Sequence, residues 1–88
     1  MITVGIVEDD TALRQSLAEL VNGESDMKCL VCCADGESAL EQIPPLRPEV
    51  VLMDIRLPGM SGVECVRKLK MICPDSQVMM LTILEDYN

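Results

Sequence analysis

The chain of 88 residues is long enough for only one small domain. Apolar residues make up 49% of it, but it has no Phe or Trp and a single Tyr, so its core must consist of aliphatic side chains and Met. The net charge of −8 argues against direct contact between this segment and nucleic acid, whose phosphates attract Lys and Arg.

The first part of the chain predicts a strand, a helix and a second strand. Apolar residues over 2–7 indicate a strand that ends at Glu8-Asp9-Asp10, and a helix follows with Asp10 or Thr11 as its N-cap. Asn22-Gly23 ends this helix, and the apolar run from Met27 to Ala34 predicts the second strand. The helix should bury a stripe of four residues: Leu13, Leu17, Leu20 and Val21.

A second helix and a central strand follow. Asp35-Gly36 opens a short helix that runs to Ile43, and Pro44-Pro45 and Pro48 should forbid its continuation. The apolar run over 49–54 shows no alternation and is therefore typical of a strand buried on both faces of a parallel sheet. It stops at a single acid, Asp54, which is either a carboxylate of a functional site or a residue that only begins a turn.

The remaining residues predict a third helix and a fourth strand. The helix should begin at Ser61 or Gly62, after a loop rich in Gly and Pro, and end at Pro74-Asp75. We expect it to bury four residues: Val63, Val66, Leu69 and Ile72. The fourth strand runs from Val78 to Leu81 and ends at Thr82.

The five cysteines favour reduced, buried thiols over a metal site or disulfides. Cys29 and Cys32 have the spacing of half a zinc site, but the chain has no His and no second close pair. If residues 27–34 form a regular strand, these two side chains point to opposite faces and cannot share one metal. The start of the chain also lacks a signal peptide pattern, and no apolar run approaches the roughly 18 residues of a membrane helix. We therefore expect a cytoplasmic segment without membrane contact.

Alternating strands and helices predict an α/β fold with a parallel sheet and right-handed crossovers. Oxygen-bearing side chains follow three of the strands, at Glu8-Asp9, Asp54 and Thr82. If the first and third strands are neighbours, their carboxylates meet at one edge and repel one another unless a cation intervenes. A small set of oxygen ligands suits Mg²⁺. The simpler explanation, that acids stabilise a helix N-terminus, accounts for Asp10 but not for Asp54 and Thr82.

At these positions the chain resembles the receiver domain of bacterial two-component response regulators. The matching segments are Ile6 to Asp10, Val51 to Gly62 and Met79 to Thr82. The resemblance implies a three-layer, flavodoxin-like fold with strand order 2-1-3-4 and one receiver domain over residues 1–88. The sequence around Asp54 is most similar to regulators with a helix-turn-helix output domain, which implies a role in transcription.

The resemblance also implies roles for single residues. Asp54 matches the aspartate that a sensor histidine kinase or phosphotransfer protein phosphorylates. Mg²⁺ would be held by Glu8, Asp9, Asp54 and the main-chain carbonyl of Arg56. Thr82 matches the switch hydroxyl that reports phosphorylation. The resemblance thus implies a signalling phosphoacceptor rather than an enzyme acting on other substrates.

The chain departs from this family at its end. The family's fifth strand, with its lysine, and its last helix have no counterpart before Asn88, so we expect a C-terminally truncated receiver. The fourth strand would then be an unpaired apolar edge beside an uncovered sheet face, which predicts self-association.

Two alternatives stay open. A phosphohydrolase of the haloacid dehalogenase type would need a second acid two residues after Asp54, where this chain has Arg56. The second alternative is a receiver-like module that no longer accepts phosphate and acts through protein association.

Overall fold

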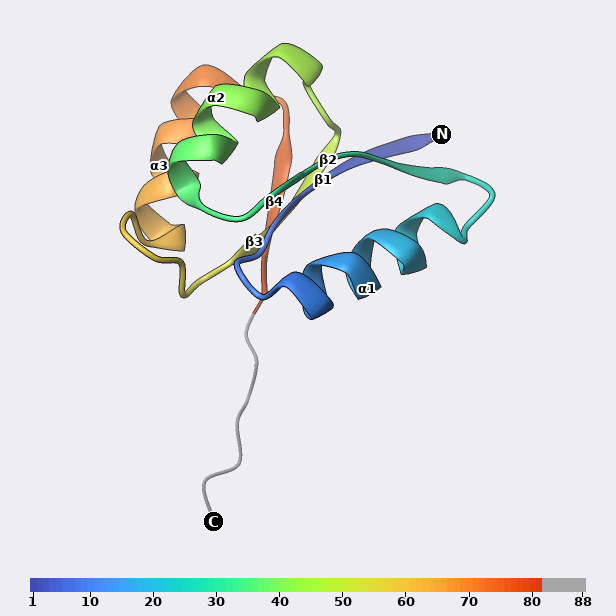
Figure 1. Cartoon of the computed structure of the whole chain (residues 1–88). Helices are drawn as coiled ribbons and strands as arrows, with labels where there is room; N and C mark the ends of the chain where they lie inside the picture. Colours follow the sequence, from blue (N-terminus) through green and yellow to red (C-terminus); the bar gives the residue numbers. More distant parts are fainter. Residues whose placement is uncertain (82–88) are drawn as a thin grey trace.

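A computed structural model describes residues 1–81 and shows a four-stranded, fully parallel sheet with strand order β2-β1-β3-β4. Helices connect the successive strands (Figure 1). The elements are β1 (Ile2–Val7), α1 (Thr11–Asn22), β2 (Met27–Cys33), α2 (Gly36–Leu46), β3 (Val50–Asp54), α3 (Gly62–Ile72) and β4 (Gln77–Leu81). This order and topology confirm the predicted α/β, flavodoxin-like arrangement.

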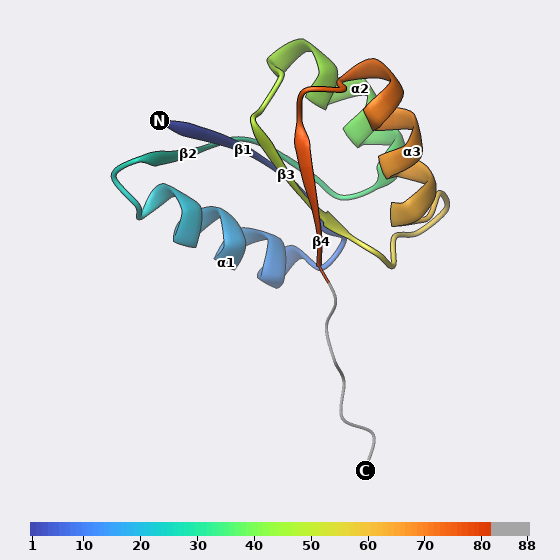
Figure 2. The same ribbon diagram turned by 180° about the vertical axis from the view of Figure 1, so that it is seen from behind.

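The helices form two outer layers around the sheet. Helix α1 covers one face, and α2 and α3 lie side by side on the other, as Figure 1 and the reverse view in Figure 2 both show. Because β1 and β3 are the inner strands, most of their side chains are buried or partly buried on both faces. This explains why their sequences lack the alternation of a half-exposed strand.

The larger part of the core lies between the sheet and the α2–α3 layer. Its buried members come from β1, β2, α2, β3 and α3: Val7, Cys33, Ala39, Ile43, Val51, Met53, Cys65 and Leu69. A smaller cluster on the α1 face contains Val4, Ile6 and Val21. Three of the five cysteines are buried, as expected for thiols that serve as small apolar residues.

Side-chain caps start all three helices at the positions that the sequence indicates. The carboxylate of Asp10 accepts a hydrogen bond from the N–H of Leu13, and that of Asp35 accepts one from Ser38. Ser61 caps α3, so this helix begins immediately behind the loop that follows Asp54. Each cap satisfies an N–H that the first helical turn leaves free.

The prediction that prolines end the second helix before residue 44 is wrong. Helix α2 includes Pro44 and Pro45 and continues to Leu46. Both prolines lie in its last turn, where each removes one N–H donor without interrupting a longer run of bonds. The helix bonding resumes at once, because the N–H of Arg47 donates to the carbonyl of Ile43 over 3.1 Å.

The predicted apolar stripes were partly wrong. Leu20 of α1 is 71% exposed, and Val63 and Ile72 of α3 are also more than half exposed. In α3 the buried stripe is instead formed by Gly62, Cys65 and Leu69. The spacing of these three residues places Val63 about 100–160° away from them around the helix, on a side that the sheet does not cover.

The prediction that Cys29 and Cys32 point to opposite faces is also wrong. Their Sγ atoms lie 3.6 Å apart. Strand β2 is irregular at this point: Cys29 pairs with Val4, but the next residue of β1, Gly5, pairs with Val31. One extra residue therefore interrupts the alternation of β2 and returns Cys32 to the face of Cys29.

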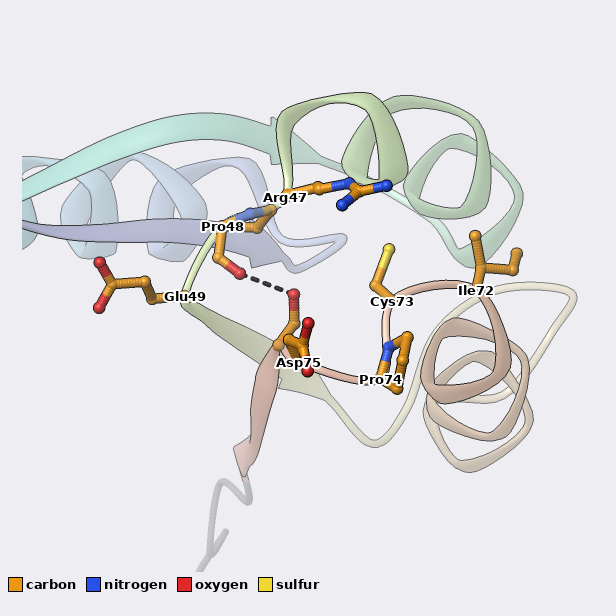
Figure 3. Close-up of a pocket in the computed structure, with 8 residues that line it drawn as sticks. Arg47, Pro48, Glu49, Ile72, Cys73, Pro74 and Asp75 are labelled. Atoms are coloured by element: carbon orange, nitrogen blue, oxygen red, sulfur yellow. Dashed lines mark hydrogen bonds between the residues drawn. The ribbon is translucent and has the colours of Figure 1, made fainter.

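A shallow cavity of about 320 Å³ lies at the amino ends of β3 and β4 (Figure 3). It is lined by residues 47–49 and 72–76, and the hydroxyl of Ser76 donates to the carbonyl of Pro48 across 2.6 Å. This bond fixes the entry to β4 against the entry to β3. Within residues 1–81, none of the helices has the length and apolar character of a membrane span.

Candidate functional site

Three carboxylates meet at the carboxyl edge of the sheet. Glu8 and Asp9 directly follow β1, and Asp54 is the last residue of β3. Because β1 and β3 are paired neighbours, with Val7 opposite Met53, their ends bring these side chains together. One oxygen of each carboxylate lies within 4.8 Å of the others. The predicted convergence of the three acids is confirmed.

Glu8 is the most deeply buried member of the cluster, with 2% of its surface exposed. Its Oε2 accepts a hydrogen bond from the N–H of Asp10, whereas its Oε1 is buried and has no partner in the described part of the chain. Burial, together with the nearby charge of Asp54, raises the pKa of Glu8 to about 7 although the Asp10 N–H lowers it. An ionised Glu8 therefore needs a positive charge beside it.

Asp54 is held by the loop that follows it. The main-chain N–H of Arg56 donates to its Oδ1 over 3.2 Å, and Asp54 is 9% exposed. The start of α3 packs directly against this loop, because the N–H of Gly62 donates to the carbonyl of Ile55 over 3.0 Å. A side chain on Gly62 would overlap the main-chain carbonyl of Asp54. Glycine at this position lets the helix approach the acid closely.

A second contact fixes the outer part of the same loop. Gly59 has a φ of 72°, which favours glycine, and the next residue, Met60, donates its N–H to Oε1 of Glu37. Glu37 belongs to the first turn of α2. The loop between β3 and α3 is thus anchored to two helices.

Arg14 is a contributor that the sequence reasoning missed. Its guanidinium donates to the main-chain carbonyls of Glu8, over 2.8 Å, and Asp9, over 3.3 Å. It therefore stiffens the segment that carries two of the acids without neutralising their carboxylates. The sequence could have predicted this contact, because Arg14 lies one turn into the helix that follows the two acids.

The residues present suit a hard divalent cation. All donor groups in the cluster are carboxylate oxygens, the set that Mg²⁺ prefers, and the partnerless Oε1 of Glu8 is an acceptor in need of a positive partner. The partly exposed arrangement also leaves room for water, which Mg²⁺ usually retains. The acidic cluster therefore fits the ion that the sequence predicts.

Two predicted site groups, the carbonyl of Arg56 and the hydroxyl of Thr82, stay predictions. The structure defines a contact for the N–H of Arg56, and the role of its carbonyl oxygen stays a prediction. Thr82 lies outside the described residues 1–81, as does the segment around Tyr87.

The family comparison agrees with this geometry. A family model described as the response regulator receiver domain matches residues 4–88. The chain belongs to this family. Receiver domains are signalling modules of two-component systems, and the acidic cluster with Asp54 fits their phosphoacceptor site.

Individual relatives with different names match this chain. The chain is 34% identical to the transcriptional regulatory protein LnrK of Bacillus subtilis over 86 residues, and 35% identical to a protein-glutamate methylesterase/protein-glutamine glutaminase of Burkholderia thailandensis over 79 residues. The crystal structure of the response regulator domain of Thermotoga maritima CheB superposes with a TM-score of 0.86 at 30% identity, covering 91% of this chain and 59% of that one.

The receiver described here corresponds to only part of these relatives. The matches cover 98% of this chain but 39% of LnrK, and 90% of this chain but 22% of the methylesterase. The chain thus spans less than half of the length of each of these two relatives.

Proposed function

We propose that Asp54 of this receiver domain accepts a phosphoryl group from a sensor histidine kinase or phosphotransfer protein in the presence of Mg²⁺. The observation that carries the proposal is the convergence of Asp54 with Glu8 and Asp9 at the end of adjacent parallel strands. An isolated turn aspartate would not need two further acids within ligand distance. In open α/β sheets this edge is also where ligands bind.

The chemistry follows from the groups at the site. A carboxylate oxygen of Asp54 attacks the phosphorus of a phosphohistidine, so that an O–P bond forms, the N–P bond breaks and the leaving imidazole takes up a proton. Mg²⁺ would neutralise charge on the transferring phosphoryl group. Glu8 and Asp9 would hold the cation, with the carbonyl of Arg56 as a further ligand. The N–H of Arg56 orients the attacking carboxylate through its bond to Oδ1.

The test is phosphorylation by acetyl phosphate followed by measurement of the intact mass. We expect one phosphoryl group per chain with Mg²⁺ and none with EDTA or in Asp54→Asn. The matched control is Asp75→Asn, which changes an exposed acid beside the amino end of β4 and should react as the unchanged chain does. Lack of any adduct under all conditions would favour the second candidate, a receiver-like module that acts through association alone.

The receiver would act as a phosphoacceptor in the cytoplasm rather than as an enzyme on other substrates. We expect no turnover of a phosphomonoester, because Arg56 occupies the position where a phosphatase of the haloacid dehalogenase type needs an acid. Thr82 would report the phosphoryl group through its hydroxyl. The similarity to LnrK supports a transcriptional output, whereas the methylesterase relative would correspond to an enzymatic one.

Self-association through β4 is the remaining part of the proposal. Among the described strands β4 pairs only with β3, and its Met79 and Met80 are 57% and 38% exposed. An apolar edge of this kind favours pairing with a second copy. Light scattering of the 88-residue chain should show association that Met79→Lys weakens, whereas Met71→Lys, at an 80% exposed position of α3, should not. A concentration-independent monomer would contradict this part.

A further inference from the structure

Cys29 and Cys32 form a pair of sulfur ligands that the acidic site does not use. The irregularity in β2 places both on the α1 face of the sheet, since Cys29 pairs with Val4 and Cys32 with Ile6. Their Sγ atoms are 3.6 Å apart, Cys32 is exposed and Cys29 is half-buried. Strand β2 pairs only with β1 among the described strands, so the pair lies at an edge of the sheet.

The separation of the sulfurs matches a shared tetrahedral metal. With Zn–S bonds of about 2.3 Å, two thiolates on one tetrahedral zinc lie about 3.8 Å apart. The observed 3.6 Å is within a few tenths of an ångström of this value. Zinc could therefore bind both sulfurs without moving the strand.

A disulfide fits the same geometry less well. Because the partners of Cys29 and Cys32 on β1 are two residues apart, the two Cα atoms are separated by about two strand steps, or roughly 6.6 Å. This is the upper end of the range that a disulfide spans, about 4.4–6.8 Å.

We propose that Cys29 and Cys32 bind zinc together with the same two residues of a second copy of this chain. A structural zinc site takes four ligands. The chain has no His, and the only cluster of three or more potential ligand residues within residues 1–81 is the acidic one at Glu8, Asp9 and Asp54. Two ligands must therefore come from outside, and a two-fold axis through the metal supplies a matching pair. The exposed Cys32 at the free edge of β2 gives a second copy access to the site.

Metal binding would replace the thiol protons. Each Cys releases one proton and forms one S–Zn bond, so a dimer with four thiolates releases four protons per zinc. No change of oxidation state is involved. In the metal-free chain the Cys29 thiol donates instead to the carbonyl of Val31, over 3.6 Å, and this bond would be lost.

The experiment titrates the reduced Met79→Lys variant, in which association through β4 is weakened, with Zn²⁺ in the presence of excess Mg²⁺, which would occupy the acidic cluster. We expect the molar mass from light scattering to double at half an equivalent of zinc and to return to the starting value with EDTA. Substituting Co²⁺ should give the thiolate-to-metal charge-transfer absorption and the visible bands of tetrahedral cobalt. The absorption reports sulfur ligation independently of the mass.

Serine variants complete the test. Cys29→Ser and Cys32→Ser, at positions that are not fully buried, should each abolish the mass doubling and weaken the cobalt spectrum. Cys73→Ser is the control and should retain both, with circular dichroism checking that all variants are folded. A monomer that holds one zinc per chain, or a zinc response that persists in both the Cys29 and Cys32 variants, would overturn the shared site.

Discussion

Replacing Glu8 with Gln should stabilise the metal-free protein at neutral and alkaline pH. Glu8 has a pKa of about 7 in the folded chain against an ordinary value of 4.5, because burial disfavours its charged form. Between these two values the folded state binds more protons than the unfolded state. The free energy of unfolding must therefore fall as pH rises through this window.

The size of this effect follows from the pKa change. At about 1.4 kcal/mol per pKa unit, the ionised Glu8 costs the folded state about 3 kcal/mol above pH 7. Gln has nearly the same shape, cannot ionise, and its amide oxygen can still accept from the N–H of Asp10. The free energy of unfolding of the Glu8→Gln variant should thus exceed that of the unchanged chain by about 3 kcal/mol at pH 8, and the two values should be equal below pH 4.5.

Urea unfolding in EDTA across pH 4–8 measures the difference directly. The control is Glu64→Gln, an exposed acid of α3, whose pH profile should run parallel to that of the unchanged chain. Parallel profiles for the Glu8 variant, or a difference that shrinks as pH rises, would refute the reasoning about its burial.

Three further predictions concern the cation and the loop behind Asp54. Mg²⁺ at 100 times its dissociation constant should raise the free energy of unfolding by about 2.7 kcal/mol, and Asp9→Asn should remove most of this gain in a urea titration. Gly62→Ala should lower the free energy of unfolding by about 3 kcal/mol, because the added Cβ overlaps the carbonyl of Asp54, whereas Gly23→Ala, with 3.2 Å to its nearest atom, should cost less. Ser61→Ala removes the cap of α3 and should cost about 1 kcal/mol by the same assay, without abolishing phosphorylation.

The strands, the helix starts and the acids at the strand ends could be predicted because each depends on a strong local signal, whereas the strand order followed from the resemblance to receiver domains. A continuous apolar run such as the one before Asp54 indicates a doubly covered strand, and the carboxyl ends of parallel strands share one edge. The placement of Glu8 and Asp9 followed from the adjacency of β1 and β3, which the observed pairing confirms. The helix starts were equally accessible, since Asp10 and Asp35 have the side chains that cap helices.

The features that could not be predicted depend on tertiary contacts. The extra residue in β2 arises from the pairing of β2 with β1, and no residue type around Cys29 predicts it from the sequence. Helix α2 includes Pro44 and Pro45 although each removes one N–H donor, because both lie in its last turn and the N–H of Arg47 restores the bonding to Ile43, so the usual rule for proline failed at this end. The exposure of Val63 and Ile72 reflects how little of α3 the sheet covers, which the spacing of apolar residues alone does not reveal.

The central claim is that the three carboxylates form one cation pocket in which Asp54 is the phosphorylated group. The most direct measurement reduces the acetyl phosphate-treated protein with borohydride, which converts an acyl phosphate to an alcohol, and maps the product by peptide mass analysis. The account predicts that Asp54 alone is reduced and only when Mg²⁺ is present. Reduction at Glu8 or Asp9 in place of Asp54, or at Asp54 to the same extent in EDTA, would contradict it.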